Sequence, residues 1–261
     1  MQAGRDSTRR NRNIGTSRRG HGRNNKLVLP IRYFPISSYY YERLDTYCVV
    51  HLDIGARQFT FLVEETRAGS YHACTPEDVA HLLRHVKPDD LDGIELIILR
   101  QPKRKEEILS PAWGRWVPYI TIDEKFRGSA IILEAVPLDK PIRWAKSLVP
   151  EDARELNRLK ADGHRVKMSR RHHIILLSLE SVRSTQLYRT LLHEIGHHVD
   201  YSRNKEAFDR KLMHEKEVFA NRYAEVLLGE LEAKRITPFD RIFSTDLAER
   251  LGLRISDFTE I

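Results

Sequence analysis

The spacing of apolar residues predicts mainly strands in the first half of the chain. Short runs rich in Val, Ile, Phe and Thr predict strands at residues 47–52, 58–63, 94–99, 119–122 and 130–136. Asp53-Ile54-Gly55, between the first two runs, favours a hairpin. We therefore expect residues 27–145 to form a strand-rich, mixed α/β region whose role the sequence does not indicate.

Helical spacing dominates the second half. The first half contains only one such signal, Thr75-Pro76-Glu77-Asp78, which predicts the start of a helix; Lys103–Glu107 there predicts a charged turn or loop. Beyond Pro150 the pattern predicts helices over 150–160, from Ser184 to about Tyr201, over 214–233 and over 246–251, with a strand at 173–179. The expected fold class is α+β, with a helical core and an adjoining strand over residues 146–261.

The positive charge is concentrated at the N-terminus. Residues 1–26 hold eight of the 44 Lys and Arg residues and one of the 37 Asp and Glu residues, so residues 27–261 hold 36 of each. Residues 1–26 are rich in Arg, Asn, Gly and Ser and have little to bury, which predicts a disordered basic tail. We expect the basic pI of 9.4 to describe this tail rather than a folded surface. The tail is either a nucleic-acid-binding arm or a solubilising leader.

The remaining composition narrows the class of protein. No apolar run approaches the ~18 residues that a transmembrane helix needs, and the N-terminus has no apolar signal-peptide segment. Cys48 and Cys74 are too few for a disulfide framework or a four-cysteine zinc site. We expect a cytoplasmic protein with two free thiols and no membrane association.

One segment carries the residues of a metal site. His193-Glu194-Ile195-Gly196-His197 lies in a predicted helix, where a spacing of four places both imidazoles on one face. Two such histidines can share one zinc ion. Glu194, next to the first histidine, is placed to accept a proton from water as a general base. Gly196 allows another backbone or a substrate to approach the helix closely.

A third metal ligand is available on the following helix. Glu217 shares a helix face with the small residues Ala220 and Ala224, and an unpaired carboxylate on such a face is costly. His214, one turn earlier on the same face, is the rival ligand. We favour Glu217 because the stripe of small residues, which allows close packing, extends from it.

Other residues near this segment have expected roles. Asp200 is placed to orient a metal-binding side chain without binding the metal itself. His198 is expected to pack against other residues or to form hydrogen bonds. The candidates for stabilising a tetrahedral intermediate are Tyr201, Tyr223, His172 and Arg222.

Two motifs together resemble a known family. Leu-Leu-His-Glu-Ile-Gly-His-His-Val-Asp at 191–200, followed by Glu-x-x-Ala-Asn-x-Tyr-Ala at 217–224, resembles the gluzincin metallopeptidases and within them the ImmA/IrrE-like family. The resemblance covers roughly residues 172–230. It implies a zincin-like core, zinc ligands His193, His197 and Glu217, and Glu194 as general base. It also implies that the strand at 173–179 lines the substrate cleft, with His172, His173, Arg170 and Arg171 facing the substrate; the alternative is an ordinary sheet strand with a polar end. Members of that family cut regulatory proteins, often DNA-binding repressors, although this chain shows no helix-turn-helix segment.

The leading hypothesis is therefore a cytoplasmic zinc metallopeptidase that acts on a protein substrate. One alternative is a nucleic-acid-associated factor that uses the basic arm and keeps the zincin fold as a scaffold. A DNA-associated protease would combine the two, but the chain lacks the cysteine-rich zinc ribbon that SprT-like proteases often carry. The intact Glu194 disfavours a third alternative, a pseudoenzyme that only binds a partner.

Overall fold

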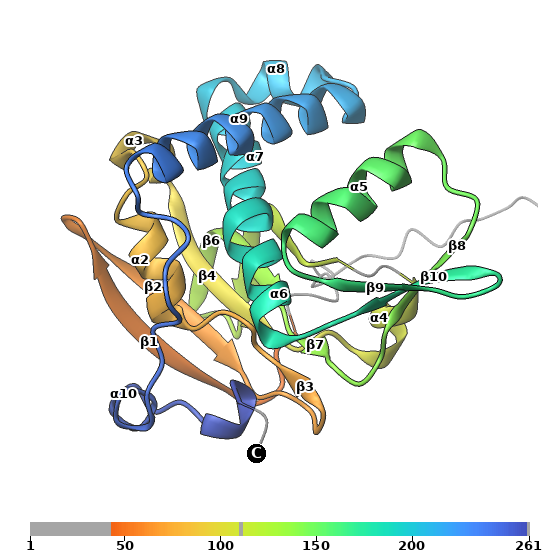
Figure 1. Ribbon diagram of the computed structural model, residues 1–261. Coiled ribbons are helices and arrows are strands. Elements are labelled where there is room, and N and C mark those ends of the chain that lie inside the picture. Colours follow the sequence, from red (N-terminus) through yellow and green to blue (C-terminus); the bar gives the residue numbers. More distant parts are fainter. Residues whose placement is uncertain (1–42, 110–111, 260–261) are drawn as a thin grey trace, which may run out of the picture. The chain divides into compact units, whose positions relative to one another are not determined.

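A computed structural model describes residues 43–109 and 112–259 of the chain (Figure 1). The predicted disordered tail at 1–26 lies outside the described residues. Helices and strands are both abundant, which confirms the expected mixed α+β class. No helix of the described residues is long and apolar enough to cross a membrane.

A five-stranded mixed sheet forms the centre of the fold. Its strands, in spatial order, are β1 (Tyr47–Ile54), β2 (Arg57–Glu64), β4 (Ile94–Arg100), β6 (Phe126–Glu134) and β5 (Gly114–Ile122). β2, β4 and β6 run parallel, while β1 and β5 pair antiparallel at the two edges. The predicted hairpin joins β1 to β2 through Gly55, whose φ of 62° suits glycine. The edge position of β5 matters for the site described below.

Two smaller sheets complete the strand content of the described residues. β3 (Ser70–Tyr71) pairs with β7 (Val136–Pro137). The other sheet is antiparallel and has the order β8 (Ile142–Ala145), β10 (His172–Leu176), β9 (Arg165–Met168). β10 is thus paired along both of its edges.

The helices pack around these sheets (Figure 1). They are α2 (Pro76–Leu83), α3 (Pro88–Leu91), α4 (Arg104–Leu109), α5 (Pro150–Ala161), α6 (Leu179–Thr185), the π-helical segment η2 (Gln186–Leu191), α7 (Leu192–Arg203), α8 (Lys205–Arg210), α9 (Met213–Ala233), α10 (Thr245–Arg250) and the 3₁₀ turn η3 (Ile255–Asp257). α2 begins with the predicted capping box of Thr75 and Asp78.

Two local predictions were wrong. The helix expected to begin at Ser184 begins instead after Ser178, whose hydroxyl accepts a hydrogen bond of 3.2 Å from the backbone N–H of Ser181. The turn or loop expected at 103–107 is largely the helix α4. Its start is fixed by Glu106, which accepts hydrogen bonds from the Lys103 backbone and the Arg100 guanidinium.

One hydrophobic core joins the two regions that the sequence suggested. It contains Phe61 and Ile97 of the central sheet together with Leu192, Ile195 and Leu231 of α7 and α9. All five are fully buried. The described residues, 43–109 and 112–259, all belong to one compact unit. The expected boundary between residues 145 and 146 therefore does not separate two compact units.

Candidate metal centre

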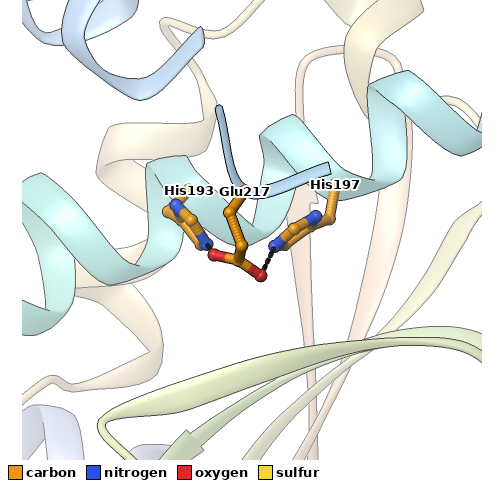
Figure 2. A group of neighbouring side chains, drawn as sticks. All are labelled: His193, His197 and Glu217. Carbon is orange, nitrogen blue, oxygen red and sulfur yellow. Dashed lines mark ion pairs between the residues drawn. The ribbon is translucent and has the colours of Figure 1, made fainter. Parts of the chain in front are cut away.

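α7 presents two imidazoles side by side. His193 and His197 lie one helical turn apart, and their ring centroids are 4.6 Å apart. Their side chains are only 20% and 13% exposed. Figure 2 shows both rings on the same side of the helix, as the spacing of four predicted.

α9 approaches α7 closely at one glycine. A Cβ added to Gly196 would lie 2.9 Å from the Cα of Ala220 and 3.0 Å from its carbonyl oxygen. Any side chain at position 196 would therefore push the two helices apart. The contact brings the N-terminal half of α9 to the histidines, with Glu217 nearly one turn before Ala220.

Glu217 completes a three-residue group. Its Oε2 lies 3.3 Å from Nε2 of His193 and its Oε1 lies 3.4 Å from Nε2 of His197 (Figure 2). One ligand atom from each of the three residues lies within 4.8 Å of the others, so the group can hold a metal ion. Ligands at about 2.1 Å from a tetrahedral zinc are separated by about 3.4 Å, which matches these spacings. The rival ligand His214 is exposed and is not part of the group.

The electrostatics of the group keep the Glu217 carboxyl ionised. Hydrogen bonds from His193 and His197 hold the pKa of the Glu217 carboxyl well below its usual range. Burial opposes protonation of His193, but its contacts with Glu217, Glu194 and Asn221 outweigh burial and raise its pKa. The carboxylate is thus ionised and is held between two imidazole nitrogens.

Glu194 contacts the edge of the central sheet. It is 8% exposed, and its Oε2 accepts a hydrogen bond of 2.6 Å from the backbone N–H of Trp116 in β5. Burial raises the pKa of this carboxyl, although the two histidines and the Trp116 N–H oppose the rise. A carboxyl with a raised pKa beside a metal-binding group is suited to proton transfer.

A cavity of about 440 Å³ opens beside His193 and Glu194. Its walls come from the start of β5, from α5, from η2 and from α9, and include Trp113, Tyr188, Thr190, Asn221 and Leu228. The carboxylate of Glu194 and the ring of His193 are thus at the wall of a space that a ligand can enter.

The π-helical segment η2 positions β5 against α7, the helix that carries His193 and His197. A Cβ on Gly114 would lie 2.9 Å from the Thr190 side chain and 2.6 Å from a backbone oxygen of β6. The Gln186 amide donates hydrogen bonds to the carbonyl oxygens of Trp113, at 2.9 Å, and Glu134, at 2.7 Å. π-Helical turns within α-helices are frequent at functional sites.

His198 has the packing role that the sequence predicted. It is 3% exposed, and its Nε2–H donates a hydrogen bond of 2.7 Å to the carbonyl oxygen of Asp92. Its ring also packs on Trp116, with centroids 6.0 Å apart. These contacts fasten α7 to the sheet and to the loop after α3.

The expected role of Asp200 was wrong. Its Oδ1 lies 2.5 Å from Nζ of Lys211, and its buried Oδ2 has no hydrogen-bond partner. Asp200 therefore pairs with the segment that leads into α9, and it does not orient His193 or His197. This link still fixes how α9 follows α7.

The strand expected to line the cleft was also wrong. β10 is the central strand of the small sheet and has no free edge for a substrate. β5, which contacts Glu194, is the strand beside the group. Sequence spacing gave no sign of this, because 78 residues separate Trp116 from Glu194.

None of the four suggested intermediate stabilisers lines the cavity beside Glu194. The Tyr201 ring packs on Trp116, with centroids 5.1 Å apart. The Tyr223 hydroxyl donates a hydrogen bond of 2.8 Å to Asp90, and Arg222 lines a different cavity together with Tyr223. His172 lies on the exposed small sheet. Asn221, which contacts His193 and lines the cavity, was missed as a site residue although it belongs to the Glu-x-x-Ala-Asn motif.

Comparison of the chain with models of known protein families, with curated proteins and with solved structures finds no significant match in any of the three.

Proposed function

We propose that this protein is a zinc-dependent metallopeptidase that hydrolyses a peptide bond in a protein substrate. The observation that carries the proposal is the convergence of His193, His197 and Glu217 beside a buried Glu194 at the wall of a cavity. Catalytic zinc sites have three protein ligands and a general base close to the metal.

The donor set fits zinc. Two imidazole nitrogens and one carboxylate oxygen are ligands that zinc accepts, and a set of three leaves a position for water or substrate. The carboxylate is ionised, as binding requires. When bound, zinc supplies Lewis acidity toward water and toward a carbonyl oxygen.

The chain's own residues supply the proton transfer and the orientation. Trp116 holds Oε2 of Glu194 through its backbone N–H, which leaves Oε1 to accept a proton from water. The same carboxyl then donates that proton to the nitrogen of the leaving amine. A carboxyl whose pKa is raised by burial takes up and releases a proton more readily near neutral pH than an exposed one.

The edge of β5 supports a peptide as substrate. Among the described strands, β5 is the outer strand of the central sheet and pairs with β6 alone. An extended peptide can add to such an edge through backbone hydrogen bonds. The lack of an N–H at Pro118 limits this pairing to the start of the strand, which is the end nearest Glu194.

The likeness of 191–200 and 217–224 to the ImmA/IrrE-like pattern also supports a peptidase. That likeness makes a regulatory protein the substrate class to test first. Its expected fold, a zincin-like core, is part of the proposal.

Substrate trapping tests the proposal. Glu194→Gln keeps an oxygen that can accept from Trp116 but removes the base, so this variant should bind zinc as wild type does and retain intact substrates. Proteins captured with it are compared with those captured by wild type and by the control Glu232→Gln, which changes an exposed acid of α9. A protein retained by Glu194→Gln and cleaved by wild type and the control supports the proposal. Cleavage of that protein by Glu194→Gln at the wild-type rate would exclude the assigned base.

A further inference from the structure

The small sheet carries a concentration of positive charge that the total composition hides. Residues 140–148 and 163–178, which contain β8, β9 and β10, include no Asp or Glu. Seven exposed cations lie in them. Lys140 pairs with Glu107, and the other six are Arg143, Lys146, Arg165, Lys167, Arg170 and Arg171. We call these six residues the basic sheet.

Strand alternation places half of these cations on one face. Leu156 and Leu159 of α5 pack with Ile175, which is fully buried, on the inner face. Successive residues of a strand point to opposite faces, so Ile174 lies on the outer face. Residues paired across two strands share a face, so its partners Arg143 and Lys167 lie there too. Leu176 and its partner Arg165 belong to the outer face as well.

The turn of the hairpin extends this charge. Arg170 and Arg171 lie between β9 and β10, where the Ser169 hydroxyl accepts a hydrogen bond of 2.9 Å from the His172 backbone. Lys146 is held beside them because its backbone N–H donates to the carbonyl oxygen of Arg171 at 3.0 Å. Figure 1 shows this hairpin extending away from the central sheet.

None of the six cations has an ion pair with the described part of the chain, which sets them apart from their neighbours. Arg154 and Arg158 of α5 pair with Glu151 and Glu225, and Arg189 pairs with Glu155. Like charges gathered without counter-charges repel one another. A surface of this kind attracts a polyanion.

We propose that the basic sheet binds the phosphate backbone of a nucleic-acid duplex. Arg165 and Lys167 are about 6.7 Å apart along β9, and Arg143 and Lys167 are about 10 Å apart across the sheet. This spreads charge over a surface, as the regularly spaced phosphates of a duplex require. The outer face has no Phe, Tyr or Trp on which an unpaired base could stack, and His172 is its one aromatic ring, which favours a duplex over a single strand.

The proposal changes the expectation that positive charge belongs to the N-terminal tail alone. Residues 27–261 hold equal numbers of acidic and basic residues, but those charges are separated in space. Contacts with phosphates alone carry no base readout, so the binding is independent of sequence. It also uses none of the residues of the metal centre.

The test compares two variants of the full chain with equal net charge. The sheet variant changes Arg165, Lys167, Arg170 and Arg171 to Gln. The control changes four exposed cations elsewhere, Lys125, Arg127, Lys234 and Arg250, to Gln. Residues 1–26 are the same in every protein. Binding to a labelled DNA duplex, to the corresponding single strand and to poly-glutamate is measured between about 50 and 200 mM salt.

We expect the sheet variant to bind the duplex about tenfold more weakly or worse than wild type. The magnitude of the slope of log K against log salt should fall by about 3.6, since each of the four lost phosphate contacts removes about 0.9. The control should stay within about twofold of wild type. If the sheet variant melts at a lower temperature than wild type, the turn variant Arg170→Gln/Arg171→Gln replaces it, with an expected slope change of about two.

Equal duplex binding by the sheet variant and the control would overturn the proposal. Wild-type binding to poly-glutamate as tight as to the duplex would overturn it in favour of an acidic protein partner. Tighter binding to the single strand would overturn the assignment of a duplex. Loss of zinc in His193→Ala should leave duplex binding unchanged, so failure of the metallopeptidase proposal and failure of this one are distinguishable.

Discussion

The backbone N–H of Trp116 donates a hydrogen bond of 2.6 Å to Oε2 of Glu194. This contact joins the edge strand of the central sheet to the helix that carries His193 and His197. It fixes the carboxylate by a group that no side-chain substitution other than proline removes. The position of the proposed general base therefore depends on the strand order of the sheet as well as on the helix.

Shortening this carboxylate tests its positioning. In Glu194→Asp the carboxyl is one methylene shorter, so it cannot keep the Trp116 hydrogen bond and also reach the former position of Oε1. We expect peptide hydrolysis to fall about 10²- to 10⁴-fold, the usual contribution of general acid–base catalysis. Zinc content should be unchanged. Initial rates on the trapped substrate measure the effect, and activity within a factor of two of wild type would contradict the assigned role.

Gly196→Ala tests the close packing of α7 and α9. The added methyl would lie 2.9 Å from the Ala220 backbone, so the helices must separate and Glu217 moves away from the histidines. We expect zinc affinity to fall at least tenfold, measured by competition with a chelator. The control is Gly229→Ala on the partner helix α9, where a Cβ would meet open space; it should stabilise the protein by up to about 1 kcal/mol. Unchanged zinc affinity in Gly196→Ala would show that the packing does not position Glu217.

A buried ion pair connects α2 to the helix that leads into the metal centre. Asp78 is fully buried and accepts hydrogen bonds of 3.1 and 2.9 Å from the Arg183 guanidinium of α6. Asp78→Ala leaves that charge buried without its carboxylate, which should lower the free energy of unfolding by about 3–5 kcal/mol. Glu77→Ala removes only the surface pair with Arg84, at 3.5 Å, and should change it by less than about 1 kcal/mol. Urea unfolding measures both, and equal losses would refute the buried-pair account.

The buried His72 makes stability depend on pH. It is 2% exposed, its Nε2–H donates to the Glu64 carbonyl at 2.7 Å, and burial lowers its pKa from 6.5 to about 4. Between pH 6.5 and about 4, His72 is protonated in the unfolded chain but stays neutral in the folded chain. The contribution of the neutral, buried His72 to stability is therefore complete above pH 6.5 and is lost as the pH falls toward 4. At about pH 5 the loss should be about 2 kcal/mol.

His72→Gln isolates this contribution. The variant is less stable at neutral pH, but its free energy of unfolding should fall about 2 kcal/mol less than that of wild type between about pH 7.5 and pH 5. Urea unfolding at both pH values gives the comparison. An identical pH dependence in the two proteins would mean that His72 titrates alike in the folded and unfolded states.

The local sequence pattern predicted most helices and strands, together with the metal-binding group. His193 and His197 follow from a spacing of four, and Glu217 follows from its face of small residues. Features that depend on distant segments were missed. Trp116 reaches Glu194 only because β5 is the edge strand of the sheet. The local spacing of apolar residues does not determine the order of strands in a sheet. Likewise, the choice of Ser178 over Ser184 as helix cap depends on the burial of Val182 between them.

Zinc content of the purified protein tests the metal centre most directly. Wild type should contain about one zinc per chain, measured by mass spectrometry of the elements. His193→Ala, His197→Ala and Glu217→Ala should each lose most of it, because each removes one of three ligands. His214→Ala should retain the wild-type content, since His214 lies outside the group. Zinc retained at wild-type level in both histidine variants, or lost in His214→Ala alone, would contradict the account.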